Sequence, residues 1–258
     1  MTRPEPPGRE DQVLFGRNPV LELLRSGSRR VEEIAILSEG RGPALHDLLG
    51  LARRQGVKIS FRTRDQLTAI AGDPHHQGVV ARVAGATYSS LDDLLTIPAT
   101  RGEPAFFVAL DQVQDPRNLG AVIRSAEATG VHGLIVPKHH AAGLTGAAAK
   151  SAMGAADLVP VTRETNLVQA LEELKKNGVW TVGAVPAGGT LPWEMDLTGP
   201  LCLVLGGEGE GLRPLVARTC DFVTSLPMRG RLGSLNVSAA AAVLCYEVVR
   251  QRARREKT

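Results

Sequence analysis

Apolar and polar positions along the first third of the chain follow two different periods, which predict short strands between amphipathic helices. Leu45, Leu48, Leu49 and Ala52 fall on one helical face, whereas the run 31–37 has the composition of a strand. Such alternation over a short stretch is typical of a compact α/β/α module. The expected elements are a helix around 20–24, a strand at 31–37, a helix at 43–55 and strands at 57–61 and 78–83.

From residue 105 onward the alternation continues, but the strands become apolar at nearly every position. Such strands are buried on both faces, which is typical of a mostly parallel α/β sheet covered by helices on each side. In these sheets a ligand lies beyond the carboxyl ends of the strands. The expected strands are 105–110, 133–136, 179–184, 201–205 and 222–226, and the expected helices are 118–129, 166–177, 212–218 and 236–253.

The residues between the two regions are rich in Gly, Ser and Pro, which indicates a linker that carries a short helix at 91–95. The first residues are polar and rich in proline, and they lack the apolar stretch of a signal peptide. The expected division is a disordered lead over 1–11, a small module over 12–84, a linker over 85–104 and a larger domain over 105–258.

Charge changes this picture only slightly. The chain of 258 residues carries 30 Lys and Arg against 27 Asp and Glu, a net charge of +3, which permits an anionic partner without requiring one. The basic residues gather in the first quarter and in the tail 250–257. Any one of these charges is best explained as a solvated surface side chain, but the clusters together favour contact with RNA or DNA phosphate.

The composition also argues against several kinds of site. The three cysteines lie far apart without a C-x-x-C pair, which argues against zinc and fits a reducing cytoplasm. Two pairs of adjacent histidines have no carboxylate cluster beside them, so we expect no metal site. A run of about 18 apolar residues would predict a membrane span, and the sequence has none.

Three separated segments each join an expected strand to a helix, and they carry the candidate chemistry. In the first, Asp115 to Gly120, Pro116 fixes a turn and Asn118 is a good helix N-cap. Arg124 follows on the same helix, and its planar guanidinium suits a phosphate or a hydroxyl. The structural alternative to these roles is a capping Asn and a surface Arg.

The second segment, Leu205 to Gly211, follows a buried strand and has four glycines in six residues, with Glu208 and Glu210 between them. Glycine lets a ligand approach the backbone closely. The spacing differs from the G-x-G-x-x-G dinucleotide fingerprint, and two acids would repel a pyrophosphate. A ligand with a positive centre or many donors fits better, and a tight structural turn is the alternative.

The third segment, Ser234 to Ser238, opens a long helix whose apolar stripe begins at Val237. Ser234 or Asn236 is the expected cap. Capping is compatible with ligand binding, because the start of a helix presents free N–H groups. Three such loops in one α/β domain suggest a single composite pocket.

Together these segments resemble the motifs of the SPOUT methyltransferases and, more narrowly, of the SpoU/TrmH family, which methylates the ribose 2′-hydroxyl of RNA. Two further segments, FGRNPV at 15–20 and HQGV at 76–79, resemble the L30e-like RNA-binding module at the N-terminus of that family. The likeness covers nearly the whole chain. The arrangement is most similar to the branch of the family that acts on a guanosine of 23S rRNA.

The resemblance implies S-adenosylmethionine as the cofactor, a trefoil knot in the catalytic domain, and a homodimer whose active site draws on both subunits. It implies no metal, because a sulfonium methyl group is already activated. The loop 229–233 has no clear counterpart in the family motifs. The functional residues that the resemblance implies are Arg124, Asn118, Glu208, Asn236 and Ser238, and the cofactor contacts are Gly206, Gly207, Leu226, Met228, Ser234, Leu235 and Asn236.

The reaction requires alignment and loss of a proton. The ribose oxygen, methyl carbon and sulfur must lie in line, and a poorly acidic hydroxyl must be deprotonated. We expect Arg124 to position the hydroxyl or its adjacent phosphate and to assist deprotonation. Asn118, Glu208 and Asn236 are expected to hold the loop geometry and the substrate. Two other classes stay open at this point: a non-catalytic RNA-binding or ribosome-assembly protein, and a dinucleotide-dependent oxidoreductase, whose fingerprint is missing.

Overall fold

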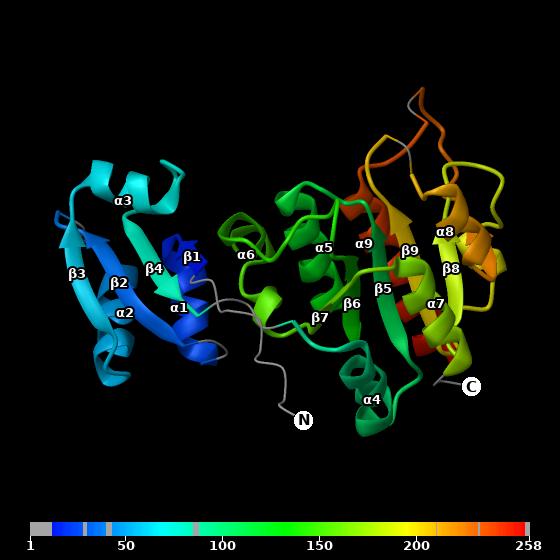
Figure 1. Ribbon diagram of the computed structural model, residues 1–258, viewed down its shortest axis with the longest axis horizontal. Coiled ribbons are helices and arrows are strands. Elements are labelled where there is room, and N and C mark those ends of the chain that lie inside the picture. The colour runs from blue at the N-terminus through cyan, green and yellow to red at the C-terminus, as the bar shows by residue number, and fades with distance from the viewer. Residues whose placement is uncertain are drawn as a thin grey trace, which may run out of the picture.

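The computed structural model describes residues 12–27, 30–39, 43–84, 88–209, 211–231 and 233–255, and within them the strands form two separate sheets (Figure 1). The first sheet belongs to the first third of the chain and the second sheet to the remainder. Both sheets are covered by helices on both faces, as the alternation of strands and helices predicted. The expected lead at 1–11 lies outside the described residues.

The first module is built on a mixed four-stranded sheet in the order β1-β4-β2-β3. Strand β2 pairs in parallel with β3 and antiparallel with β4. Apolar side chains of α1 and α2 pack on one face, whereas α3 covers the other face through Leu67. The elements are β1 (Gln12–Phe15), α1 (Arg17–Ser26), β2 (Val31–Leu37), α2 (Pro43–Arg54), β3 (Lys58–Arg62), α3 (Arg64–Ala71) and β4 (Val79–Val83).

The second domain is built on six parallel strands in the order β10-β8-β9-β5-β6-β7. Alternate residues of the central strand β5 point to opposite faces. Phe106, Val108 and Leu110 pack toward α5, α6 and α9, whereas Phe107 and Ala109 pack toward α4, α7 and α8. The elements are α4 (Leu91–Arg101), β5 (Phe106–Asp111), α5 (Pro116–Ala128), β6 (Gly133–Pro137), α6 (Gly146–Ala152), η1 (Ala155–Asp157), β7 (Val161–Glu164), α7 (Leu167–Lys176), β8 (Trp180–Ala184), η2 (Pro192–Glu194), β9 (Leu201–Gly206), α8 (Pro214–Thr219), β10 (Phe222–Thr224) and α9 (Val237–Arg255).

The strands and helices expected within 105–258 are all present, with ends that shift by one or two residues. The elements β1, α3, β7 and α6 were not predicted. The sequence of α6 is Gly-Ala-Ala-Ala-Lys-Ser-Ala, which has no large apolar residue to mark a buried face. Helix α4 extends well beyond the short helix expected at 91–95, because a capping box at Ser90 starts it and Gly102 in the left-handed region ends it. Its Leu94 is fully buried in the core of the second domain.

Helix α6 forms the junction between the module and the second domain. On one side it packs on α5, where a Cβ at Gly120 would overlap the carbonyl oxygen of Ala148. On the other side it contacts β1. Lys150 Nζ donates a hydrogen bond to the carbonyl of His75 at 3.1 Å and lies 4.5 Å from the centroid of the Phe15 ring. The small residues of α6 therefore allow two packed layers to approach it at once.

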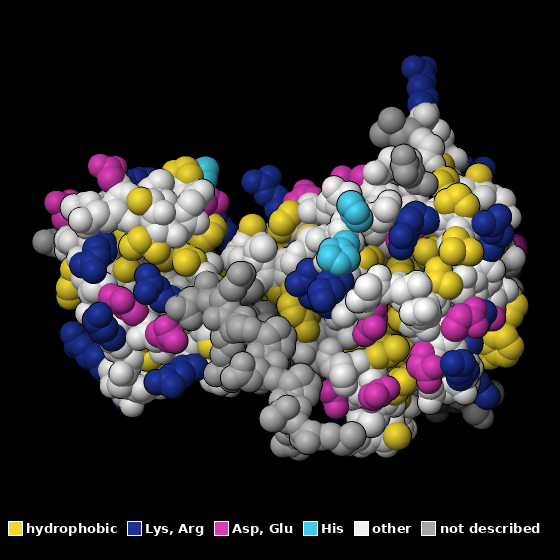
Figure 2. Space-filling view, viewed as in Figure 1, with side chains coloured by type: hydrophobic (Ala, Val, Ile, Leu, Met, Phe, Trp, Pro, Cys, Tyr) yellow, Lys and Arg dark blue, Asp and Glu magenta, His cyan; other side chains and the backbone are white. Residues whose placement is uncertain are grey.

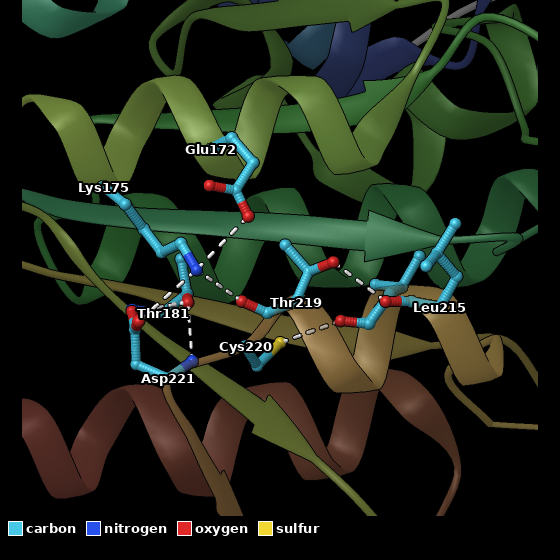
Figure 3. A network of polar contacts seen from close by, with 8 residues as sticks. Glu172, Lys175, Thr181, Leu215, Thr219, Cys220 and Asp221 are labelled. Atoms are coloured by element: carbon cyan, nitrogen blue, oxygen red, sulfur yellow. Dashed lines mark hydrogen bonds and ion pairs between the residues drawn. The ribbon is translucent and has the colours of Figure 1, made fainter.

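A polar network fixes the outer edge of the large sheet (Figure 3). Asp221, directly before β10, accepts hydrogen bonds from the backbone N–H and the hydroxyl of Thr181 at 2.9 and 2.8 Å. Lys175 of α7 donates to the carbonyl of Thr219 at 2.8 Å, and its Nζ lies 3.5 Å from Asp221 Oδ1. The network ties α7, α8 and β10 to β8, so Asp221 has a structural role in this sheet.

The cysteines occupy the core or its margin. Burial raises the pKa of the Cys245 thiol to about 12 and that of Cys220 to about 11, and it raises the pKa of Cys202 further. These thiols are therefore protonated at neutral pH and unreactive as nucleophiles. None of the helices within the described residues combines the length and apolar character that a membrane crossing requires.

A buried histidine makes the stability of this fold depend on pH. His132 is fully buried, and its Nδ1 accepts a hydrogen bond from the backbone N–H of Phe106 at 3.1 Å. Burial, and then the charge of Arg101, lowers the pKa of His132, although Glu103 acts in the opposite direction. Below about pH 6.5 the unfolded chain takes up a proton that the folded chain resists. We therefore expect the free energy of unfolding to fall as the pH drops below that value.

Urea unfolding at about pH 7.5 and about pH 5.5 would measure this loss. His132→Asn keeps an acceptor for the N–H of Phe106 and should reduce the difference between the two pH values. His139→Asn, at an exposed position, should leave that difference as in the wild type. An unchanged difference in His132→Asn would contradict the assignment.

Candidate active site

The carboxyl ends of β8, β9 and β10 meet at one edge of the large sheet, and the loops that follow them surround a cavity of about 480 Å³. This volume lies within the range of small-molecule sites. The connection from β10 to α9, in orange at the upper right of Figure 1, forms one wall of the cavity. Residues that line the cavity come from four stretches, namely 184–186, 205–209 with Gly211, 224–228 and 233–244.

A cluster of three polar side chains lies at the margin of this cavity. Glu208 Oε1 accepts hydrogen bonds from Asn118 Nδ2 at 2.7 Å and from Asn236 Nδ2 at 2.6 Å. Asn236 Nδ2 also lies 3.1 Å from Asn118 Oδ1 and donates to it. The three segments singled out in the sequence therefore meet at one point.

The structure corrects the capping role expected for Asn118. Asp115 is the N-cap of α5, and its side chain accepts a hydrogen bond from the N–H of Arg117 at 2.8 Å. Asn118 lies inside the first turn of the helix and is buried, which leaves its amide free to reach Glu208. Its contact is thus with a distant loop rather than with its own helix.

Asn236 has the capping role that was expected of it. Its Oδ1 accepts hydrogen bonds from the backbone N–H of Ser238 at 2.9 Å and from the Ser238 hydroxyl at 2.6 Å. Because Oδ1 is occupied in this way, Nδ2 is directed toward Glu208. Among the described residues, the contact of Ser238 with the polar cluster runs through Asn236.

The glycine loop after β9 is held in place by contacts of the chain with itself. A Cβ at Gly206 would overlap the backbone of Gly211, and a Cβ at Gly207 would overlap the carbonyl of Gln112. These glycines are thus required by close packing of backbone on backbone, whereas the sequence suggested that they admit a ligand. Glu210 lies outside the described residues.

An ion pair between a buried carboxylate and a partly exposed arginine anchors the same loop to β5. Asp111 is fully buried at the end of β5, and its Oδ1 lies 2.7 Å from Arg213 Nη2 and 2.8 Å from Arg213 Nε. The other carboxylate oxygen accepts from the backbone N–H of Arg213 at 2.9 Å. The backbone N–H of Gly207 donates to the carbonyl of Asp111 at 2.7 Å. Neither Asp111 nor Arg213 was singled out from the sequence, although both flank predicted loops.

Every residue expected to contact a cofactor lines the cavity, and Glu208 lines it as well. Sequence reasoning missed the stretch Ala184 to Pro186, which follows β8. Its position at the carboxyl end of an expected parallel strand was the available signal. Among the described residues, no group of three or more His, Cys, Asp or Glu side chains is close enough to hold a metal ion.

Arg124 lies apart from the cavity. It follows Asn118 by six residues on α5, which corresponds to about 9 Å along the helix axis and a different face. The side chain is exposed, and its Nη1 contacts Met153 Sδ at 2.8 Å. Met153 terminates α6 in the left-handed region and is itself 47% exposed. Within one protomer, therefore, Arg124 is not part of the cavity wall.

Comparison with protein families decides between the open alternatives. Residues 105–246 match the SpoU rRNA methylase family, and residues 13–89 match the RNA 2′-O ribose methyltransferase substrate-binding family. The chain belongs to the SpoU rRNA methylase family. It is therefore an S-adenosylmethionine-dependent enzyme that methylates RNA at the ribose 2′-hydroxyl, as the motifs predicted.

Several relatives of this SpoU methylase match it over nearly their whole length. The 23S rRNA (guanosine-2′-O-)-methyltransferase RlmB of Ralstonia nicotianae is 40% identical over 94% of this chain and 97% of its own. A Bacillus subtilis protein, YacO, is named as a putative TrmH family tRNA/rRNA methyltransferase. It is 41% identical over 94% of this chain and 97% of its own length. The SpoU methyltransferase AviRb of Streptomyces viridochromogenes has a similar structure, with a TM-score of 0.79 and 27% identity. The similarity covers 95% of this chain and 91% of AviRb.

The cavity of this SpoU methylase fits S-adenosylmethionine. AviRb has also been solved with this cofactor bound. In the present chain, Leu226, Leu235 and Leu244 supply apolar surface to the cavity, and Glu208 supplies a negative charge at its margin. A cofactor with both an aromatic base and a cationic sulfonium suits such a mixed lining.

We expect Gly206→Ala to weaken binding of S-adenosylmethionine by about 10-fold or more, because the added methyl group forces the loop away from Gly211. Isothermal titration calorimetry would measure the affinity. Gly199→Ala is a matched control, since a Cβ there meets no atom within 4 Å. Equal affinity in the wild type and Gly206→Ala would contradict the role of this loop.

Proposed function

We propose that this enzyme methylates the ribose 2′-hydroxyl of a guanosine in 23S rRNA. The observation that carries the proposal is the cluster of Asn118, Glu208 and Asn236 at the margin of the cavity. The named target of the RlmB relatives, at about 40% identity over almost the full length, supports the choice of nucleotide and RNA. We also propose a cytoplasmic location, since the proposed substrate is rRNA.

S-adenosylmethionine, when bound, supplies a methyl group that is already activated by its sulfonium. The chain's own residues have to bind the cofactor and the RNA, orient the ribose 2′-hydroxyl and assist the loss of its proton. The backbone and apolar side chains of 205–209, Gly211, 224–228 and 233–244 would hold the cofactor. Glu208, fixed through Oε1 by two amides, would keep the cavity margin rigid and offer its second oxygen to the substrate. Ser238 would act by holding the amide of Asn236 in one orientation.

We propose that Arg124 acts on the cavity of a second subunit in a homodimer. Its position away from the cavity of its own protomer supports this arrangement. Exposed apolar side chains near α5 and on α9 support it as well. Met153, Val243 and Tyr246 are each about half exposed, and exposed large apolar side chains are the kind that a subunit interface covers. In the cavity of the second subunit, the Arg124 guanidinium would position the ribose hydroxyl or its adjacent phosphate and assist loss of the hydroxyl proton.

The same proposal assigns a separate role to each part of the chain. The module 12–84 would bind the RNA substrate, and 105–258 would carry out methyl transfer, with 85–104 between them. Helix α4 lies in that connecting stretch and packs on the large sheet. The trefoil knot that the resemblance implies stays a prediction.

The target is tested by mapping ribose methylation in rRNA and tRNA by mass spectrometry, from cells with and without this gene. We expect the loss of one 2′-O-methylguanosine from 23S rRNA. Loss of a methyl group from another rRNA position or from tRNA would retain the chemistry and overturn the target. Unchanged methylation throughout would favour a non-catalytic RNA-binding role.

We expect Arg124→Ala to lower turnover by about 100-fold or more while affinity for S-adenosylmethionine stays as in the wild type. Methyl transfer to rRNA and calorimetry would measure the two quantities. Arg218→Ala, at an exposed position on α8, is the control for loss of one surface arginine and should retain full turnover.

Mixing two inactive variants tests whether Arg124 acts across subunits. Random exchange of subunits between the Arg124→Ala and Gly206→Val dimers should restore about a quarter of wild-type activity. Half of the dimers then contain one subunit of each kind, and each of these mixed dimers has one complete site of two. Absence of any recovery, with dimers demonstrated by sedimentation, would place Arg124 and the cavity in the same subunit.

A further inference from the structure

The first module has a cavity of its own, of about 430 Å³, that methyl transfer does not use. The segments FGRNPV and HQGV, which are about 60 residues apart in the chain, converge beside it. The backbone N–H of Arg17 donates to Gln77 Oε1 at 3.1 Å, and Arg17 Nε donates to the carbonyl of Gln77 at 3.1 Å. The walls are formed by Arg17, Leu37, Arg64, Pro74, Gln77 and the 76–78 turn.

Two arginines share this cavity without an acidic partner. Among the described residues, no carboxylate lies within ion-pair distance of Arg17 or Arg64, and Arg64 is exposed and makes no side-chain hydrogen bond. Two guanidinium groups beside one cavity attract an anion to it. Their planar forks suit a phosphate. Leu37 and Pro74 offer apolar surface to a base.

The wall of the cavity is held in an uncommon backbone conformation. Gln77 has a φ of 53°, in the left-handed region that non-glycine residues rarely adopt. The two hydrogen bonds from Arg17 maintain it. The neighbouring His76 is buried and bonded through both ring nitrogens, to the N–H of Gly78 and the hydroxyl of Thr68. Backbone strain of this kind is typical of ligand clamps, because it preorganises the groups that meet the ligand.

The cavity lies next to the junction with the catalytic domain. The turn that forms its wall also contacts α6, where Lys150 Nζ lies 3.1 Å from the carbonyl oxygen of His75 and 3.8 Å from Asp73 Oδ2. An RNA bound in the cavity would therefore lie close to both parts of the chain. On the face shown in Figure 2, Lys and Arg side chains are interspersed with Asp and Glu, so the overall charge does not mark this site.

We propose that this cavity holds one unstacked nucleotide of the RNA substrate, with its phosphate on Arg17 and Arg64 and its base beside Gln77. The inference rests on the proposed function in that it takes RNA as the substrate. Sequence-specific proteins read RNA largely through unpaired nucleotides splayed out of the helix, and a cavity of this size accommodates one. The Gln77 amide nitrogen, which has no partner among the described residues, would donate to the base.

The test is equilibrium binding of unmodified 23S rRNA, transcribed in vitro, to the full-length protein between about 50 and 200 mM salt. Arg64→Ala should weaken binding roughly 5- to 10-fold and reduce the slope of log affinity against log salt by about 0.7 to 1. Arg64→Lys should restore the slope but only part of the affinity, since it keeps the charge and loses the fork. Kinetically, the KM for RNA should rise while kcat and the affinity for S-adenosylmethionine stay unchanged.

Arg218→Ala is the matched control, because it removes the same charge from an exposed position on α8 of the second domain. It should bind rRNA with wild-type affinity and slope. If Arg64→Ala and Arg17→Ala both bind rRNA with the affinity and the salt dependence of the wild type, the proposal is overturned. Arg64-dependent binding of free 5′-GMP combined with unchanged binding of rRNA would also overturn it, and would identify a site for a free nucleotide.

The binding readout separates this proposal from the proposed function. If the wild type binds rRNA with an Arg64-dependent slope but methylates no position in it, the proposed target is wrong and the nucleotide site is supported. If the wild type methylates rRNA and the Arg17 and Arg64 variants bind it normally, the target is supported and the nucleotide site is overturned.

Discussion

One carboxylate holds the candidate active site together. Glu208 Oε1 accepts hydrogen bonds from two asparagine amides, one 90 residues earlier and the other 28 residues later in the chain. Hydrogen bonds to an ionised acceptor are about twice as strong as those between neutral groups. Each amide is oriented further, since Asn118 Oδ1 accepts from Asn236 and Asn236 Oδ1 accepts from Ser238. The start of α5, the glycine loop and the start of α9 therefore behave as one unit.

Close approach of backbone to backbone is the second constraint on this site. Within the glycine loop Gly206 packs on Gly211 and Gly207 packs on Gln112, and the ion pair of the buried Asp111 with Arg213 holds the loop against β5. Asp111 loses all contact with water, so its charge has to be balanced by the three bonds that Arg213 provides. The loop thus presents Glu208 from a rigid support, and a preorganised support is what an alignment reaction requires.

The arrangement of the two parts relates RNA binding to catalysis through α6. This short helix packs on α5 through small residues, contacts β1 of the module, and ends at Met153, which meets Arg124. The helix that carries Arg124 and the module that belongs to the substrate-binding family therefore share a single support. A methyltransferase that acts on a large RNA needs its binding and reacting groups in fixed relation, and a tightly packed junction provides this.

The sequence by itself determined the order and type of most elements, because buried parallel strands and amphipathic helices impose their periods on the chain. It also determined the family, because the three segments 115–120, 205–211 and 234–238 together match the motifs of that family. Helix α6 escaped prediction since alanines mark no face, and the N-cap of α5 was placed three residues late because Asp115 and Asn118 are both suitable caps. Only the tertiary structure decided that Asn118 bonds to Glu208, that Asp111 pairs with Arg213, and that Arg124 lies outside its own cavity. These facts depend on which distant side chains share a point in space, and local periodicity carries no information about that.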